Sequence, residues 1–482
     1  MAHAFATDTA ASRPAALPAT RPVLRIVGCA VAASGVLGAL GASGWLVLAA
    51  AQRPSVLSPP SLREPHGWLM GPLSGLLPHL SSDPRRLHTD FTVALVVLCV
   101  AWLVAWAAAP ALPVKVVAAG VGLAQVVFLL SPPQSLTDTF NYIVYGRMAA
   151  RGLNPYTHVP AVAPHDTAYA LANWHHLPSP YGPLFTLLCE PLGVLPTATA
   201  YWIWKAVVVG SALGLLALVW WLAVRLGRSP QRALAAAGLC PVVLAVGIGG
   251  FHNDAPAMLC VVGAAACLVQ GARAPAAARW DAAAAALAVA AAGLKPSFAI
   301  VVPIVVLGAH RRVAALAGAA AAGAVVGAVV LLAFGGATPA VGAQSRLVTP
   351  LSVPNLLGVA LGHDGADAAI RAAGHDALFV VVAIAAALVL WRRRLALPAV
   401  GVVLLAAALT LSWVMPWYLG WSLPFAALAR PRALVPLAVV GCLWLGLGGS
   451  PQMVKVIHAF GYFPTRSATG MTNHLYERSL VR

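Results

Sequence analysis

Residues 199–224, TAYWIWKAVVVGSALGLLALVWWLAV, form an apolar run longer than the roughly 20 residues that a helix needs to cross a bilayer. Similar runs recur along the 482-residue chain, which is 60% hydrophobic and only 9% charged. Soluble domains carry roughly 25% charged residues, so this chain could not cover a soluble surface. The runs are continuous and do not alternate, which excludes a closed β-barrel. The composition therefore predicts an all-α polytopic membrane protein.

The apolar runs predict about 12 to 13 helices that cross the membrane fully or halfway. They belong to one transmembrane domain over residues 26–449, preceded by a disordered cytoplasmic N-terminus (1–25) and followed by a tail (450–482). The runs are 26–50, 91–109, 113–131, 199–224, 233–249, 255–271, 282–294, 297–310, 313–334, 377–391, 395–412, 416–429 and 433–449.

Arginines and acids alternate between the connections that join these runs. Cytoplasmic loops carry an excess of Lys and Arg, so the arginine-bearing connections and the N-terminus are predicted to be cytoplasmic. Most acids fall in connections of opposite parity, which include three long extracytoplasmic loops, 51–90, 132–198 and 335–376. The arginines are Arg13, Arg21, Arg25, Arg225, Arg228, Arg232, Arg273, Arg279, Arg311, Arg312, Arg392, Arg393, Arg394, Arg430 and Arg432.

The net charge of +17 follows from these scattered arginines and does not indicate a nucleic-acid surface. The seven cysteines lie in apolar segments without CxxC or metal-ligand spacing, so no metal site is predicted. The sequence also has no P-loop and no HExxH pattern, which argues against nucleotide chemistry on the cytoplasmic side.

Residues 137–156, TDTFNYIVYGRMAARGLNPY, place many polar side chains in the second long loop. Thr137 or Asp138 can cap a short helix that runs to about Arg151. A capping role alone would explain Asp138, and anchoring to lipid headgroups would explain Arg147 and Arg151. Both interpretations leave open a role of these residues in substrate binding.

A second polar cluster lies in GGFHNDAP, residues 249–256, between two apolar runs. His252, Asn253 and Asp254 are three consecutive polar residues, more than a tight turn requires. A turn capped by Asp254 is the simpler alternative.

The motif LKPS, residues 294–297, separates two runs that are each about 20 Å long as helices, short of the roughly 30 Å hydrocarbon core. We expect two half-length helices that meet at Lys295 below the extracytoplasmic surface. A lysine there costs about 2.5–3.5 kcal/mol, so it should face a cavity or a counter-ion. The alternative is that Lys295 snorkels to the interface.

Other candidates in the outer segments are weaker. Gln344 and Arg346 begin the third long loop, and SWVMPWYLGW, residues 412–421, carries several aromatics. An aromatic belt at the membrane interface explains those tryptophans without a substrate.

Carboxylates and a histidine on one face, together with cations near the outer leaflet, suit glycosyl transfer from a polyprenyl-phosphate sugar. An aspartate can deprotonate the attacking hydroxyl, and cations stabilise the charge that grows on the departing phosphate. A lipid-linked donor also needs no nucleotide outside the cell.

Four motifs, D138TFNYIVYGRMAARGLNPY156, YGPL at 181–184, GFHNDA at 250–255 and LKPS at 294–297, occur in this order among a dozen or so spans. With them the chain resembles the polyprenol-phosphate-mannose-dependent α-1,6-mannosyltransferases, GT-C-fold enzymes of lipomannan and lipoarabinomannan biosynthesis. The resemblance implies a polyprenyl-phosphate-mannose donor, a mannan or lipomannan acceptor, and inversion at the anomeric carbon. It also implies a catalytic aspartate in an early extracytoplasmic loop, which maps onto Asp138.

The sequence departs from the family pattern in two ways. The loop with Asp138 follows the third predicted span and not the first, and Asp138 has no second acid beside it. The resemblance therefore leaves open whether a divalent cation, Mg²⁺ or Mn²⁺, acts as a cofactor.

The hypothesis is an extracytoplasmic active site in the plasma membrane with Asp138 as general base. Phosphate binding is assigned to Lys295, Arg346 and Arg147, and sugar or acceptor binding to His252, Asn253, Asp254, Tyr142, Tyr145, Asn154, Tyr156 and Tyr181. One alternative is a transferase of another lipid-linked sugar, such as arabinofuranose or glucose. Another is a polyprenyl-sugar flippase or transporter, for which paired broken helices in repeated halves would be expected; one break is evident, at Lys295.

Overall fold

The computed structural model describes residues 22–52, 67–77, 83–429, 433–463 and 468–481. These residues form helices and connecting loops, with no strand among them. Disorder was predicted for residues 1–25, of which residues 1–21 lie outside the described residues. The first helix begins at Pro22.

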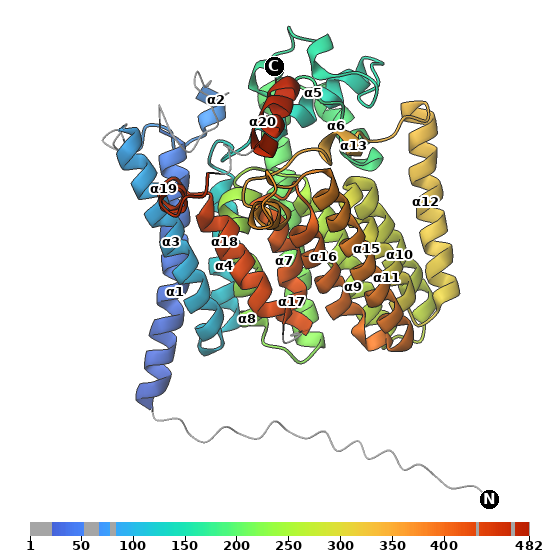
Figure 1. Cartoon of the computed structure of the whole chain (residues 1–482). Coiled ribbons are helices and arrows are strands. Elements are labelled where there is room, and N and C mark those ends of the chain that lie inside the picture. The colour runs from blue at the N-terminus through green and yellow to red at the C-terminus, as the bar shows by residue number, and fades with distance from the viewer. Residues whose placement is uncertain (1–21, 53–66, 78–82, 430–432, 464–467, 482) are drawn as a thin grey trace, which may run out of the picture.

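Eight helices of the described residues are long and apolar enough to cross a membrane. They stand side by side in one bundle (Figure 1). Seven of them are α1 (Pro22–Ala50), α3 (Pro84–Ala108), α7 (Thr197–Arg225), α9 (Asp254–Gly271), α10 (Ala277–Leu294), α12 (Arg312–Phe334) and α15 (Ala368–Trp391). The eighth is α16 (Ala396–Thr410) together with η7 (Arg393–Leu395), which directly precedes it. The prediction of an all-α polytopic membrane protein is confirmed.

Further segments are bent or short. The helix pairs α8 (Pro230–Gly238) with η5 (Val242–Ile248), and α18 (Leu434–Gly448) with α19 (Pro451–Ala459), bend by 49° and 95°. The shorter apolar helices are α4 (Val114–Phe128) and the continuous pair η6 (Pro296–Ile300) and α11 (Val301–Gly308). Each predicted run except 416–429 corresponds to one of these segments or to one of the eight spans.

The remaining elements are short. Helices α2, α5, α6, α13 and α20 gather at the end of the bundle that is uppermost in Figure 1. The elements are α2 (Gly67–Met70), η2 (Ala109–Ala111), α5 (Asp138–Ala150), η3 (Pro160–Val162), η4 (Tyr169–Leu171), α6 (Pro183–Gly193), α13 (Val341–Gln344), α14 (Val353–Ala360), η7 (Arg393–Leu395), η8 (Pro416–Ser422), α17 (Leu423–Ala429) and α20 (Ala468–Val481).

The prediction of two half-length helices at Lys295 is wrong for the first of the two helices. Helix α10 begins at Ala277 and has 18 residues, which is about 27 Å and close to a full span. The apolar run appeared shorter because Asp281 interrupts it, but this carboxylate is buried and accepts a hydrogen bond from the Arg311 backbone N–H at 2.7 Å. The break itself is confirmed, since Lys295 is extended (φ −143°, ψ 113°) between α10 and η6.

The expectation of a single broken helix is also wrong. Pro241 stands between α8 and η5, and Pro451 begins α19 after the sharp bend behind α18. Proline lacks an N–H and clashes with the preceding turn, which accounts for a bend at both places. The first bend lies inside the predicted run 233–249, and the second lies just after the predicted run 433–449.

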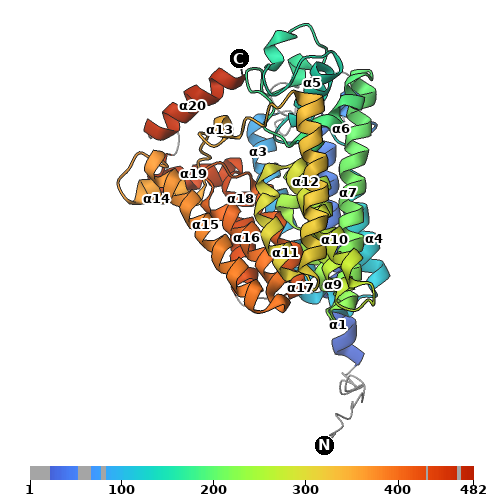
Figure 2. The ribbon, with the colours of Figure 1, turned by 90° about the vertical axis from the view of Figure 1, so that its right-hand side faces the viewer.

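The helices differ in how deeply they are buried. In α9, 61% of the span is buried inside the protein, against 6% in α12, which stands at the edge of the bundle (Figures 1 and 2). Figure 2 shows α14, α15 and α20 on the left, α7 on the right, and α12 in front between them. The exposed apolar faces of α12 and α15 fit lipid contact, while α7 and α9 belong to the core.

Candidate active site

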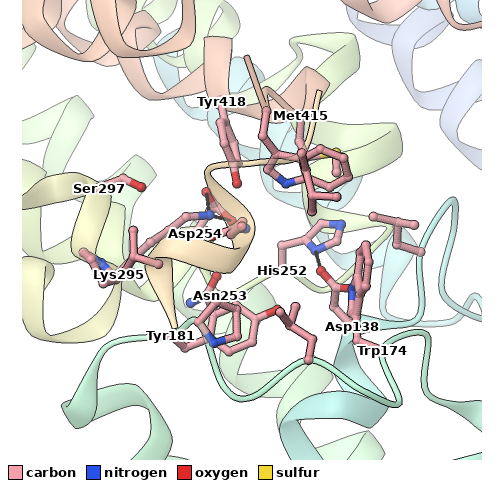
Figure 3. A pocket seen from close by; sticks show the side chains of 18 of the residues that line it. Asp138, Trp174, Tyr181, His252, Asn253, Asp254, Lys295, Ser297, Met415 and Tyr418 are labelled. Atoms are coloured by element: carbon pink, nitrogen blue, oxygen red, sulfur yellow. Dashed lines mark hydrogen bonds and ion pairs between the residues drawn. The ribbon is translucent and has the colours of Figure 1, made fainter. Parts of the chain in front are cut away.

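A pocket with about 670 Å³ of empty space, including the part open to solvent, lies where six segments meet at the upper end of the bundle. The segments are the start of α5, the loop 172–182, the turn before α9, the break before η6, residues 341–347 at α13, and the stretch 413–418. The four motifs singled out in the sequence all contribute to this pocket. Figure 3 shows their side chains facing one another across it.

Asp138 is the first residue of α5, and its carboxylate faces the pocket. Its Oδ1 accepts a hydrogen bond from Trp174 Nε1 at 3.1 Å, and its Oδ2 lies 3.5 Å from His252 Nδ1. Thr137, the N-cap, makes no side-chain capping bond and donates to Asn173 Oδ1 at 2.7 Å. The alternative that Asp138 is simply a helix cap is therefore wrong.

Helix α5 holds the loop that carries Trp174. Asn141 Oδ1 accepts from the backbone N–H groups of Asn173 and Trp174, and its Nδ2 donates to the Trp174 carbonyl at 2.8 Å. Tyr145 donates its hydroxyl to the Leu177 carbonyl at 2.7 Å. Tyr145, predicted to bind sugar, thus supports the pocket wall from behind.

The second pocket carboxylate, Asp254, begins α9 and is surrounded by donors. Lys295 Nζ lies 2.8 and 2.9 Å from its two oxygens. The indole N–H groups of Trp417 and Trp421 donate to it at 3.0 and 2.8 Å. Figure 3 shows Lys295 and Asp254 beside each other, with Tyr418 close by.

The expectation that Lys295 faces a counter-ion and a cavity is confirmed, because it pairs with Asp254 and lines the pocket. Its Nζ also lies 4.4 Å from the centre of the Tyr418 ring. A snorkelling lysine would expose its ammonium group, whereas Lys295 is buried.

His252 is oriented by an unusual backbone turn. Phe251, just before it, has φ +53°, a left-handed conformation that costs a bulky residue of order 1–3 kcal/mol. The Phe251 carbonyl accepts from Trp204 Nε1 at 2.8 Å, which holds this turn in place. The His252 ring stacks on Trp417 with centroids 3.7 Å apart, and its buried Nε2 makes no hydrogen bond within the described residues.

The YGPL motif closes the pocket against the helix break. The Gly182 N–H donates to the Leu294 carbonyl at 3.2 Å, and a Cβ at Gly182 would lie 2.1 Å from the Gly293 oxygen, so only glycine fits. Tyr181 packs edge-on against Tyr142 at 5.0 Å. Burial, together with the charge of Asp138, raises the pKa of Tyr181, which therefore keeps its hydroxyl proton at neutral pH.

The C-terminal helix α20 braces the loop beside Asp138. Leu480 packs with Trp174, Leu177 and Leu347 in a small apolar cluster, and its carbonyl accepts from the His176 N–H at 2.7 Å. The segment predicted as a tail thus contacts the wall of the pocket.

Arg147, predicted to bind phosphate, lies away from the pocket. It forms a buried ion pair with Asp166 and donates to the Leu195 carbonyl at 3.0 Å and to Thr197 Oγ1 at 2.9 Å. Arg151 lies 3.6 Å from the same carboxylate. Because Arg147 is buried, the alternative of lipid-headgroup anchoring is also wrong for it.

Three other predicted residues support the surroundings of the pocket but do not line it. The Asn154 amide donates to the Phe334 carbonyl at 2.6 Å, and the Tyr156 hydroxyl donates to the Tyr181 carbonyl at 3.0 Å. Arg346 is exposed, with its guanidinium carbon 5.0 Å from the centre of the Tyr476 ring. Of the predicted set, Asp138, Tyr142, Tyr181, His252, Asn253, Asp254 and Lys295 line the pocket together.

The sequence analysis missed the tryptophans that bind the two carboxylates. Trp417 and Trp421 are buried donors to Asp254, so the aromatic-belt interpretation is wrong for them. The signal in the sequence was their place after Pro416 in one aromatic stretch, residues 412–421. Buried Lys205 was also missed; its Nζ donates to the Ser131 carbonyl at 2.7 Å and lies 3.7 Å from the Trp202 ring.

No group of three or more His, Cys, Asp or Glu side chains is placed to hold a metal ion within the described residues. The pocket instead offers one carboxylate with a histidine beside it, and one lysine–carboxylate pair across from it. Such a site can accept a proton from a bound hydroxyl at one wall and stabilise negative charge at the other.

Comparison with known proteins places this site in a family. A family model described as "Alpha-(1->6)-mannopyranosyltransferase, N-terminal domain" matches residues 38–311, more than half of the chain. Alpha-(1->6)-mannopyranosyltransferase A of Mycobacterium tuberculosis is 27% identical over 396 residues, which cover 71% of each chain.

Shorter matches agree. Alpha-(1->6)-mannopyranosyltransferase A of Corynebacterium glutamicum is 29% identical over 133 residues, or 26% of each chain. A probable alpha-(1->6)-mannopyranosyltransferase of Mycolicibacterium smegmatis is 31% identical over 137 residues, which are 26% of this chain and 24% of the relative. No solved structure matches. With its multi-pass helical fold, the chain belongs to the alpha-(1->6)-mannopyranosyltransferase family of membrane glycosyltransferases.

Proposed function

We propose that the protein transfers mannose from a polyprenyl-phosphate-mannose donor to a mannan or lipomannan acceptor. The transfer forms α-1,6 linkages with inversion and takes place on the extracytoplasmic face. The observation that carries this proposal is the arrangement of Asp138 and Lys295 on opposite walls of one pocket. Membership of the family supports mannosyl transfer. A pocket with a carboxylate on one wall and a lysine on the other supports a single displacement reaction.

In this reaction Asp138 is the general base. Its Oδ1 is engaged by Trp174, which leaves Oδ2, beside His252, to accept the proton of the acceptor hydroxyl. The hydroxyl oxygen attacks the anomeric carbon as the bond from that carbon to the phosphate oxygen breaks. The bonding electron pair leaves with the polyprenyl phosphate, and attack from the opposite face inverts the anomeric centre.

Lys295 is the group proposed to stabilise the departing phosphate. It is the only lysine or arginine among the described residues that line the pocket. Asp254 and the Tyr418 ring hold its ammonium group in place, so its field acts on the developing charge without rearrangement. The phosphate role is kept for Lys295 alone, because Arg147 is bound to Asp166 and Arg346 lies outside the pocket.

The proposed face follows from the arginines. Helix α9 starts at the pocket with Asp254 and ends near Arg273, and α7 ends at Arg225. The pocket therefore lies at the opposite end of these spans from the arginine-bearing connections. The Lys and Arg excess favours a cytoplasmic position for those connections, which supports an extracytoplasmic position for the pocket.

The test is transfer of radiolabelled mannose from polyprenyl-phosphate mannose to a short α-1,6-mannoside by the full chain in nanodiscs. We expect an elongated α-1,6-linked product, and parallel reactions with EDTA determine whether a divalent cation is needed. Donors that carry arabinofuranose or glucose test the choice of sugar.

Two results would contradict the proposal. Transfer from a mannose nucleotide but not from the lipid donor would exclude the donor class. Demonstrated donor binding with no transfer to any mannoside, while the label crosses the membrane of a sealed vesicle, would identify a transporter.

A further inference from the structure

A second hollow, with about 1190 Å³ of empty space including the part open to solvent, lies at the end of the bundle opposite the candidate active-site pocket. It forms where α7, α9, α11 and α17 end and α16 begins. Figures 1 and 2 show these helix ends at the lower side of the molecule. No role in the proposed glycosyl transfer involves this hollow.

Its rim is cationic. Arg228, His310, Arg393 and Arg394 line the hollow and are exposed, and no acid lines it among the described residues. Arg228 Nε donates to the Leu428 carbonyl at 3.1 Å, which fixes the guanidinium at the edge of the hollow. A guanidinium has five N–H donors, so most of those on Arg228 stay available to a ligand.

The described residues around the hollow offer the arginines of its rim no acidic counter-ion. Asp281 is the one acid that the described residues place at this end of the bundle. It is buried, and its Oδ2 accepts from the Arg311 backbone N–H. The positive charge of the rim is therefore left for a ligand or for solvent to neutralise.

The floor of the hollow is apolar. It is lined by leucine and valine side chains, together with small residues of α11 and α16. These residues are Leu226, Leu268, Val269, Leu395, Leu397 and Leu428. A soluble anion gains nothing from such a floor, whereas a lipid places its phosphate at the cationic rim and its chains against the leucines.

Nearby aromatics fit a position at headgroup depth. Trp391, the last residue of α15, is exposed, and the Arg392 guanidinium carbon lies 4.0 Å from its ring centre. Tryptophan with a neighbouring cation is typical of the boundary between lipid chains and headgroups. Arg393, which directly follows Arg392, lines the hollow, so the hollow lies at the same boundary.

We propose that this hollow is a binding site for an anionic phospholipid, with the headgroup phosphate held by Arg228, Arg393 and Arg394. Arginine donates paired hydrogen bonds that match a phosphate, and each cation near a membrane surface contributes about 1 kcal/mol of attraction to anionic lipid. The site is independent of the glycosyl transfer proposed above.

The experiment titrates the purified full chain, in a non-ionic detergent, with phosphatidylglycerol or phosphatidylcholine and counts bound lipids by native mass spectrometry. The test variant is Arg393→Gln with Arg394→Gln. The matched control is Arg225→Gln with Arg279→Gln, two exposed arginines outside the hollow that each lie over a tryptophan ring. Both variants lose two positive charges at the same end of the bundle.

We expect phosphatidylglycerol to bind in preference to phosphatidylcholine, and the test variant to bind it about thirtyfold more weakly while the control stays within about twofold. Equal loss in both variants would overturn the proposal, because it would indicate a general positive field. Equal binding of the two lipids would also overturn it. So would displacement of the lipid by millimolar inorganic phosphate, since that result identifies a soluble anion as the ligand.

Discussion

The two carboxylates of the active-site pocket have opposite surroundings. Asp254 accepts from Lys295 and from the indole groups of Trp417 and Trp421, so both its oxygens are fully engaged. Asp138 accepts one indole hydrogen bond and lies 3.5 Å from a histidine nitrogen. One carboxylate is built into the protein, and the other keeps an oxygen for a substrate.

This difference gives the two carboxylates different roles, whereas the sequence predicted that Asp138 and Asp254 both contact the substrate. A carboxylate that is saturated with donors positions those donors, and here it fixes the ammonium of Lys295. A carboxylate with a remaining acceptor site can take a proton. Asp254 is thus better described as a positioning residue than as a sugar ligand.

The largest effect is expected at Asp138. Asp138→Asn keeps the shape of the side chain but removes the base, so transfer should fall by about 10²–10⁴-fold. The thermal midpoint of the detergent-purified protein should change little. The control is Asp90→Asn, which removes an exposed carboxylate whose partner, Arg86, lies 3.9 Å away. Full activity of the Asp138 variant in nanodiscs would disprove the base assignment.

The next largest effect is expected at Asp254. Asp254→Asn leaves Lys295 buried without its counter-ion, which typically costs about 3–5 kcal/mol and should lower the thermal midpoint. Adding Lys295→Met removes the unpaired charge, so the double variant should regain much of the stability while transfer stays lost.

This cycle distinguishes the two functions of the pair. If the double variant regained transfer as well as stability, Lys295 would have no part in binding the phosphate. If it regained neither, the two indole hydrogen bonds to Asp254, and not the ion pair, would carry the stability.

A smaller effect is expected at Trp174. Trp174→Phe keeps the ring in the apolar cluster but removes the N–H donor to Asp138. Hydrogen bonds to charged groups are worth about 1.5–3 kcal/mol, and losing this one should lower kcat about tenfold through poorer placement of the carboxylate. The control Trp106→Phe changes a tryptophan that stacks on Trp102, outside the pocket. Equal kcat for both variants would show that Trp174 does not position the base.

The smallest effect is expected at helix α20. Leu480→Ala shortens the side chain that packs against Trp174 and Leu177, so kcat should fall by a few-fold, less than for Trp174→Phe. Leu475→Ala, on the same helix, changes an exposed leucine and should leave kcat unchanged. Limited proteolysis checks the cause, since α20 should be cleaved faster only in the Leu480 variant.

Much of the fold could be predicted from hydropathy because each span is a continuous apolar run. The errors arose where a single residue mattered. Asp281 shortened the predicted helix before Lys295, although tertiary contact buries this acid. Pro241 and Pro451 lie within or beside apolar runs, and hydropathy does not register the bends that they accompany.

The candidate site was predictable in its motifs but not in its contacts. Consecutive polar residues in apolar surroundings pointed to His252, Asn253 and Asp254 because burying them requires partners. The partner of Lys295 could not be predicted, because Asp254 lies 41 residues earlier in the sequence, on another helix. Arg147 was misassigned for the same reason, as its partner Asp166 lies in a separate loop.

The contact of α20 with the pocket also bears on how the protein is made. The loop that carries Trp174 precedes most of the spans in the chain, whereas Leu480 follows the last of them. A nascent chain can therefore insert its helices while the wall beside Asp138 is still unbraced. The wall beside Asp138 is therefore complete only after α20 has been synthesised and has packed against this loop.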